Sequence, residues 1–213
     1  MRDIYIIGAG GFGREVFDTI QEINRIKPKF KVVGFIDEDE TKYNKTICGI
    51  EVCGNLDFFN NEICQHGKTR AVIAIGSPHM KERIAKTLEE RVIWETVIHP
   101  TAYISGHAVI NNGCIIQCFS AINSNVILNE HCIVNCNCVI GHDTSIGNYS
   151  SLMPMCGIMG NCKISERVYI GVGAVSIQGI TIGADAIVGA GSVVIRDVDT
   201  EATVVGNPAK RIK

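Results

Sequence analysis

The chain has 213 residues, a net charge of -2 and a hydrophobic content of 46%. This length allows one large domain or two modest ones, each with a buried core. The balanced charge gives no indication of binding to nucleic acid or to an anionic membrane surface. No apolar run approaches the roughly 20 residues that span a bilayer, and the N-terminus begins in a strand pattern instead of a secretory signal. We therefore expect a cytoplasmic protein without membrane insertion.

The first part of the chain alternates between strand and helix patterns. The buried run DIYIIG leads into GAGGFG, a G-x-G-x-x-G turn that spans Gly8 to Gly13. A helical pattern follows, and the next strand, KVVGFID, ends in the acid Asp37. These patterns predict a Rossmann-like α/β domain over residues 1–98. Its expected elements are strands 3–8, 31–37 and 70–76, a strand pair within 47–56, and helices 14–26 and 79–90.

From Ile104 onward, a repeat of six residues replaces this alternation. An apolar residue recurs at every sixth position through Val194, with Ser176 as the exception, and a small or apolar residue lies four positions after each. One large and one small interior residue per hexapeptide is typical of a parallel β-helix, whose coils here would contain eighteen residues. We therefore predict an all-β domain over residues 99–213, closed by the tail that begins at Val204. Five cysteines fall at the small interior position: Cys114, Cys132, Cys138, Cys156 and Cys162.

The pair His142 and Asp143 occupies the third and fourth places of its hexapeptide, which face away from the interior. Counting one coil back and one coil forward from His142 gives Ser124 and Gly160, so small residues flank the imidazole on both sides. A neutral imidazole can accept a proton near pH 7, and an adjacent carboxylate can fix its tautomer and stabilise its charged form. The pair is therefore a candidate base and acid, and a solvated corner of the β-helix is the alternative.

Several segments together resemble the bacterial sugar O-/N-acyltransferase family: IIGAGGFGRE, GFIDEDE, AIGSPHMKERI, HPTA and the terminal VVGNPAKRIK. The resemblance covers nearly the whole chain. It implies a left-handed β-helix, a homotrimer, acetyl-CoA as co-substrate between neighbouring helices, and a nucleotide-sugar held by the N-terminal domain. The family includes N-acetyltransferases of nucleotide-linked 4-amino-4,6-dideoxy sugars, which is the activity that we expect. O-acetylation of a sialic acid or a similar hydroxyl is the alternative within the family.

The resemblance also assigns roles to individual residues. It implies that His142 is the general base and that Asp143 raises its basicity. Our own mechanistic hypothesis adds a direct transfer without a covalent intermediate, with the backbone N–H near Gly160 as the candidate oxyanion donor. Acetyl-CoA contacts would fall on the coils after the base. The expected acetyl-CoA contacts are Ser151, Val172 and Ala190. Related bacillosamine-type enzymes carry a second histidine at the position of Ser151.

The glycine turn followed by Asp37 is also the pattern of dinucleotide-binding domains. A dehydrogenase is disfavoured, because only about half of the usual strands are present and a β-helix stands where a hydride-transfer domain would follow. We expect a nucleotide-sugar site, in which glycine backbone approaches the ligand and the acids bind its polar groups. The expected substrate-binding residues are Gly10, Gly11, Phe12, Asp37, Glu38 and Gly76, the last at the end of the third strand.

Two further interpretations concern metal and partners. His107 and His131 are separated by one coil plus one side, so they lie on different faces and do not favour a metal site like that of the β-helical carbonic anhydrases. We therefore expect no metal. The non-enzyme alternative is a nucleotide-sugar-binding module in which the β-helix serves only to form the trimer.

Overall fold

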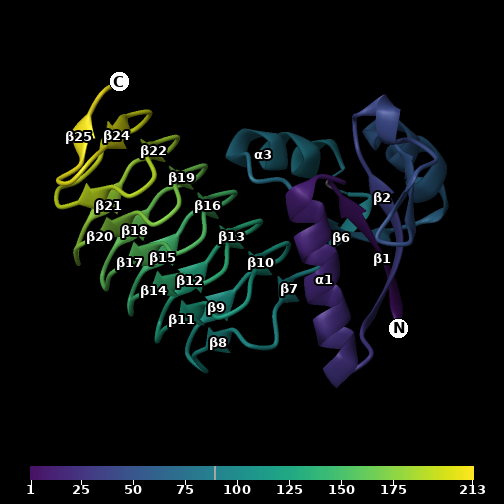
Figure 1. Ribbon diagram of the computed structural model, residues 1–213, viewed down its shortest axis with the longest axis horizontal. Coiled ribbons are helices and arrows are strands. Elements are labelled where there is room, and N and C mark those ends of the chain that lie inside the picture. The colour runs from purple at the N-terminus through teal and green to yellow at the C-terminus, as the bar shows by residue number, and fades with distance from the viewer. Residues whose placement is uncertain (89) are drawn as a thin grey trace.

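The computed structural model describes residues 1–88 and 90–213 and divides them into an α/β part and a β-helix (Figure 1). The α/β part holds a six-stranded sheet of order β3-β4-β2-β1-β5-β6, in which neighbouring strands are parallel except β3 and β4. This is the expected Rossmann-like arrangement with one antiparallel edge. The strands are β1 (Arg2–Ile7), β2 (Phe30–Ile36), β3 (Thr46–Ile47), β4 (Ile50–Gly54), β5 (Thr69–Ile73) and β6 (Val92–Trp94).

The helices begin and end close to the expected positions. Helix α1 (Gly11–Ile26) begins inside the glycine turn, three residues earlier than expected, and α3 (Pro78–Thr87) ends before the expected Glu90. Glu89, at the end of that expected helix, lies outside the described residues. The segment between β4 and β5 forms short turns that the sequence pattern did not predict. They are α2 (Leu56–Phe58), the π-helical η2 (Phe59–Ile63) and the 3-10 turn η3 (Cys64–His66), and a further turn, η1, spans Glu40–Lys42.

The hexapeptides form three parallel sheets, with each strand paired to the strand eighteen residues away, as in Ile115 with Ile133. We call the sheet that contains β7, β10, β13, β16, β19 and β22 the docking sheet. The second sheet contains β8, β11, β14, β17, β20 and β23, and the third sheet contains β9, β12, β15, β18 and β21. The strands are β7 (Val97–Ile98), β8 (Tyr103–Ile104), β9 (Val109–Ile110), β10 (Ile115–Ile116), β11 (Ala121–Ile122), β12 (Ile127–Leu128), β13 (Ile133–Val134), β14 (Val139–Ile140), β15 (Ser145–Ile146), β16 (Ser151–Leu152), β17 (Gly157–Ile158), β18 (Lys163–Ile164), β19 (Tyr169–Ile170), β20 (Val175–Ser176), β21 (Thr181–Ile182), β22 (Ile187–Val188), β23 (Val193–Val194), β24 (Thr203–Val205) and β25 (Lys210–Arg211).

The interior of the β-helix contains the residues that the six-residue repeat predicted. The five cysteines at the small position are all buried, and Ser176 is buried at a large position. The fourth residue of most hexapeptides adopts the left-handed backbone conformation, for example Asp143 with φ 57°, which turns the chain at each corner. The tail closes the C-terminal end: Ala202 and Val204 are buried in the interior cluster, and β25 pairs antiparallel with β24.

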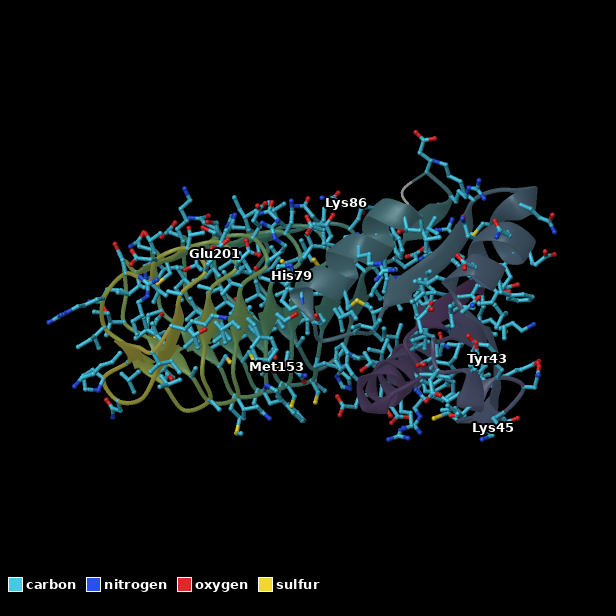
Figure 2. The ribbon with its side chains drawn as sticks, turned by 90° about the horizontal axis from the view of Figure 1, so that it is seen from above. Tyr43, Lys45, His79, Lys86, Met153 and Glu201 are labelled. Atoms are coloured by element: carbon cyan, nitrogen blue, oxygen red, sulfur yellow. The ribbon has the colours of Figure 1, made fainter. Side chains whose placement is uncertain are left out.

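The two parts pack through the docking sheet. One core cluster joins Val16 and Ile20 of α1 to Ile115 and Ile133 of the docking sheet. Helix α3 also contacts the β-helix, and Figure 2 shows His79 of α3 and Met153 of the β-helix where the two parts meet. Strand β7 ends at Ile98 and pairs with β10 of the docking sheet. The expected domain boundary after residue 98 lies at the end of this strand and stays a prediction. No described helix is long and apolar enough to cross a membrane.

Candidate active site

His142 and Asp143 form a hydrogen-bonded pair on the surface of the β-helix. His142 Nδ1 lies 2.8 Å from Asp143 Oδ2, and the side chains are 62% and 45% exposed. An ionised carboxylate can only accept, so Nδ1 carries the proton and Nε2 is left as the basic atom of the neutral ring. The left-handed backbone of Asp143 lies at the corner that turns its carboxylate beside the imidazole. The arrangement is that of a general base with an orienting acid.

The neighbouring coils hold this pair in position. Asn125 Nδ2, one coil before, donates to Asp143 Oδ1 at 2.9 Å. Hydrogen bonds from Asn125 and then from His142 hold the pKa of Asp143 below its usual value. The carboxylate therefore stays ionised beside the imidazole throughout the neutral range. Asn125 was not among the expected site residues, although counting eighteen residues back from Asp143 identifies it as the stacked neighbour.

Gly160, one coil after His142, leaves the space that the imidazole occupies. A Cβ at this position would lie 2.6 Å from His142 Nε2 and 2.7 Å from Cε1, closer than any ordinary contact. The ring therefore lies directly over the glycine backbone. In the described part of the chain, no acceptor is found for the Gly160 N–H, and its carbonyl accepts from Gly179. The Gly160 N–H is therefore free to donate a hydrogen bond to an oxygen atom that gains negative charge beside the imidazole.

The glycine turn borders a cavity of about 340 Å³ in the α/β part. Gly10, Gly11, Phe12, Asp37 and Glu38 all line it, so the structure brings five of the six expected substrate-binding residues together. The rest of its wall is largely apolar. We call it the glycine-turn cavity. Its volume lies in the range of small-ligand sites.

The glycines of the turn serve two different purposes. A Cβ on Gly13 would lie 2.0 Å from Gly8 O, and Gly8 itself has φ 109°, so these two residues allow the close approach of β1 and α1. A Cβ on Gly10 would meet nothing within 4 Å. Gly10 is the N-cap of α1 without a side-chain cap, and the first turn of the helix contains no acid. The free N–H groups of this turn can bind an anionic group such as a phosphate.

The acids of this cavity are already partly engaged. Asp37 Oδ2 accepts from Ala9 N at 2.7 Å, while Oδ1 accepts from Lys42 Nζ at 3.0 Å. Burial raises the pKa of Asp37, but hydrogen bonds from backbone amides and from Lys42 outweigh it and hold the pKa below its usual value. Glu38 Oε1 accepts from Leu56 N at 3.0 Å. Both carboxylates therefore stabilise the cavity wall through hydrogen bonds to the protein and also line the cavity.

Two expected site residues lie elsewhere. Strand β5 ends at Ile73, so Gly76 does not end the third strand of the sheet; it lines a separate cavity with His79 and Met153. Ser151 is 0% exposed on the docking sheet, beneath the α/β part. A ligand outside the protein cannot contact a side chain that the neighbouring domain covers. Ser151 is therefore excluded from the acetyl-CoA contacts that we propose.

Val172 and Ala190 lie on one edge of the β-helix, between the docking and second sheets. Val172 O accepts from Gly191 N at 2.8 Å, so the two residues belong to neighbouring coils, and Val172 is 42% exposed. His142 follows β14 and precedes β15, which puts it on the edge between the second and third sheets. Within one chain, His142 therefore lies on the edge opposite the docking sheet and its attached α/β part.

Among the described side chains, which do not include that of His66, the remaining cysteines and histidines do not form a second chemical centre. Burial raises the pKa of the Cys132 thiol, which favours its unreactive neutral form. His131 is buried and stacks on Tyr149, and burial lowers its pKa to about 4. Among those same described side chains, no group of three or more His, Cys, Asp or Glu is arranged to hold a metal ion.

Comparison with known proteins finds one domain family and several acetyltransferases. Residues 3–88 match the family described as the PglD N-terminal domain. A putative acetyltransferase of Schizosaccharomyces pombe is 42% identical over 51 residues. A 2,3,4,5-tetrahydropyridine-2,6-dicarboxylate N-acetyltransferase of Clostridium perfringens is 48% identical over 52 residues. These two matches span 24% of this chain and 25% and 22% of the relatives, so only about a quarter of each curated protein is covered.

Three solved structures match over the whole chain. A histidine variant of perosamine N-acetyltransferase from Caulobacter crescentus, in complex with CoA and GDP-perosamine, has a TM-score of 0.91 and 29% identity over 100% of this chain and 98% of that one. The acetyltransferase domain of PglB from Neisseria gonorrhoeae has a TM-score of 0.89 and 26% identity, with 100% of both chains covered. WeeI from Acinetobacter baumannii has a TM-score of 0.85 and 29% identity, again over 100% of both chains.

A glycine-turn α/β domain followed by a three-sided β-helix with an exposed His-Asp pair defines the class of hexapeptide-repeat acyltransferases. The match to the PglD N-terminal domain and the whole-chain likeness to two acetyltransferase structures narrow this class. Residues 3–88 match the PglD N-terminal domain, and the whole chain is similar to hexapeptide-repeat acetyltransferases of the PglD type.

Proposed function

We propose that the protein transfers an acetyl group from acetyl-CoA to the amino group of a nucleotide-linked 4-amino-4,6-dideoxy sugar. The observation that carries this proposal is the exposed His142–Asp143 pair, with Nε2 free and Gly160 beneath the ring. Likeness to perosamine N-acetyltransferase, whose structure contains CoA and GDP-perosamine, supports both ligand classes. The transfer occurs in the cytoplasm.

The glycine-turn cavity binds the nucleotide. Its apolar wall suits a base, while the uncapped N-terminus of α1 suits the diphosphate. Asp37 and Glu38 accept hydrogen bonds from polar groups of the nucleoside with the lone pairs that their internal bonds leave free.

The chemistry is a direct transfer without a covalent enzyme intermediate. The sugar amine attacks the thioester carbonyl carbon, so a C–N bond forms and the C–S bond breaks. His142 Nε2 takes the proton that the nitrogen loses and passes it to the departing CoA thiolate, while Asp143 stabilises the imidazolium. The Gly160 N–H stabilises the charge that develops on the thioester oxygen.

The complete site requires more than one copy of the chain. His142 lies on the edge opposite the docking sheet, while the glycine-turn cavity belongs to the part that packs on that sheet. In a homotrimer with parallel β-helices, the His142 edge of one copy faces the Val172 and Ala190 edge of the next. Acetyl-CoA then lies between them, with its pantetheine arm along Val172 and Ala190. Exposed apolar residues on the second sheet, such as Tyr103 and Val139, support such packing.

The test is the substitution of His142 by alanine. We expect kcat to fall by about 10² to 10⁴, the usual contribution of a general base, with a melting temperature close to that of the wild type because the ring is exposed. Product formation from acetyl-CoA and a panel of nucleotide-linked amino sugars is followed by mass spectrometry. A loss of less than about tenfold would show that His142 is not the base.

A further inference from the structure

A second cavity, of about 300 Å³, lies between α1 and the edge of the docking sheet that carries Val172 and Ala190 further along. Glu15, Asp18 and Thr19 of α1 line one wall. Gln117, Cys118, Asn135, Cys136 and Pro154 line the opposite wall, with Glu22 and His99 at the margin. We call it the α1 cavity. It is distinct from the glycine-turn cavity, and none of the roles described above uses it.

An unpartnered polar group lies in its wall. Gln117 is 4% exposed, and its Oε1 accepts from the Thr19 hydroxyl at 2.6 Å. Its Nε2 is buried and has no partner in the described residues. An unpaired amide in such a position costs free energy unless a ligand or water completes its hydrogen bonds. The α1 cavity therefore has a built polar wall that a ligand can complete.

The wall formed by α1 carries negative charge that no basic side chain of the described residues neutralises. Glu22 pairs with Arg25, but Glu15 and Asp18 are without an ion-pair partner in the described part of the chain. Glu15 lies close enough to Cys136 to help raise the pKa of that thiol, after burial and the neighbouring thiols. Carboxylates opposite an amide suit a ligand that carries hydroxyl groups and an ammonium group.

The two cavities lie along one face of α1. Gly11 lines the glycine-turn cavity, and Glu15, Asp18 and Glu22 follow it at helical spacings of four, three and four residues. The rise from Gly11 to Glu15 is about 6 Å, and the rise to Asp18 is about 10 Å. A diphosphate at the N-terminus of α1 would therefore direct its sugar along this face into the α1 cavity.

We propose that the α1 cavity binds the sugar of the nucleotide-linked substrate, and that Glu15 and Asp18 select a sugar with an ammonium group over one with hydroxyl groups alone. The bound ammonium gives up one proton to solvent, and the neutral amine then attacks the thioester and loses its second proton to His142. The inference rests on the proposed function. It also fits the proposed trimer. Cys136 and Pro154 line the cavity and flank His142 in the sequence, so the cavity and His142 lie at the same height along the stack of coils. In parallel β-helices the imidazole of the neighbouring copy is then level with the cavity. Gln117 completes the pocket by bonding to a ring substituent present in either sugar.

Calorimetric titration of the wild-type protein and variants tests this assignment. The probes are UDP, GDP and dTDP, followed by the nucleotide that binds, linked to a 4-amino-4,6-dideoxyhexose or to its 4-hydroxyl counterpart. In the wild type we expect the amino sugar to bind about tenfold more tightly than its counterpart, as for a hydrogen bond to a charged group. The double variant Glu15→Gln, Asp18→Asn should bind both sugars about equally, while its affinity for the nucleoside diphosphate alone is unchanged.

Two further variants complete the design. Gln117→Met should weaken both sugar-linked ligands equally and leave the diphosphate unaffected, and Glu62→Gln, an exposed carboxylate outside both cavities, should bind like the wild type. A preference for the amino sugar that survives the double substitution overturns the α1 cavity as its origin. Failure of every nucleoside diphosphate to bind the wild type instead removes the proposed function, and the sugar subsite with it.

Discussion

At the scale of single residues, the structure makes the imidazole of His142 dependent on the absence of a side chain one coil away. Its Nε2 and Cε1 occupy the space above Gly160, whereas Asp143 and Asn125 restrain the other side of the ring. The base is therefore oriented by contacts on three successive coils. Its position depends on the stacking of the coils more than on its own hexapeptide.

Substitution of Gly160 by alanine tests this dependence. The new Cβ would lie 2.6 Å from Nε2, and because the exposed ring can swing aside, the fold should survive while the base moves. We expect kcat to fall by about tenfold to a hundredfold, as for a displacement of roughly 1 Å, with little change in the KM for the nucleotide-sugar. Steady-state kinetics and a melting curve measure the two effects.

Gly106 offers a matched control for this substitution. It occupies the same place in its hexapeptide two coils before His142, and a Cβ there would meet nothing within 4 Å. Gly106→Ala should therefore retain wild-type kinetics. Equal losses in both variants would mean that the effect of Gly160→Ala comes from the β-helix in general and not from contact with His142.

The sequence could predict this pair because the repeat fixes which residues stack. Gly160 and the outward direction of His142 both follow from counting eighteen residues. The same counting could not reveal that Ser151 and His131 are covered, because periodicity defines inside and outside of a β-helix but not which side another domain packs against. The loss of Ser151 as an acetyl-CoA contact has this cause.

At the scale of elements, α3 joins the glycine-turn cavity to the β-helix. Met80 and Ile84 line the cavity, while Lys81 of the same helix is 1% exposed against the docking sheet. Lys81 Nζ donates to His131 O at 2.8 Å and to Ser150 O at 3.1 Å. Burial lowers the pKa of Lys81 to about 7 from a usual value of 10.5.

This buried amine predicts a stability that depends on pH. Above pH 7 the folded state holds Lys81 neutral, whereas the unfolded chain keeps the proton up to about pH 10. The unfolded state binds more protons in this window, so the free energy of unfolding should rise with pH, by at most about 1.4 kcal/mol per unit. Urea denaturation between pH 7.5 and 9.5 should show this rise in the wild type relative to Lys81→Met.

The control is Lys86→Met, which removes a lysine from the exposed side of the same helix. Its pKa is raised by the neighbouring Glu82, so it stays charged in both states over this range and should leave the pH slope unchanged. Parallel slopes for the wild type and Lys81→Met would contradict a neutral buried Lys81.

The elements themselves were largely predictable where a period runs long enough. The strands of the sheet and the hexapeptides follow their expected patterns, and Ile98 continues the six-residue register one step before the expected start at Ile104. The helical turns between Leu56 and His66 and the short strand β6 lack a repeated pattern and were missed. Helix α1 begins within the glycine turn because its first N–H groups need no internal partner, so the turn residues can enter the helix.

At the scale of the whole molecule, the two ligand-binding parts of the proposed site lie apart in one chain. The glycine-turn and α1 cavities lie beside the docking sheet, and His142 lies on the opposite edge. The sequence could not reveal this separation, because it depends on which sheet the α/β part covers. In the proposed mechanism, neighbouring copies therefore supply different groups to one site.

Mixing two inactive variants tests this arrangement. His142→Ala retains an intact nucleotide cavity, and Gly10→Trp, which fills the space over the N-terminus of α1, retains His142. If the sites form between copies, co-expressed variants should regain activity at about a quarter of the sites under random mixing into trimers. Activity of the purified mixture and its mass by analytical ultracentrifugation are measured together.

The outcome separates the two geometries. Mixed trimers without recovered activity would place both functions within one chain, and a monomeric wild-type protein would contradict the homotrimer itself. Each variant alone provides the baseline, and because neither substitution lies in the interior of the β-helix, both should still assemble.

The strict pairing of residues eighteen apart also sets a rule for how such a chain can change in length. Deleting one hexapeptide after His142 would rotate every later residue by a third of a turn and carry Val172 and Ala190 to a different edge. Removing or adding three hexapeptides together would preserve the alignment and alter only the height of the stack, by about 4.8 Å. Proteins of this architecture can therefore change the length of the β-helix without displacing its surface residues only by adding or removing complete coils of eighteen residues.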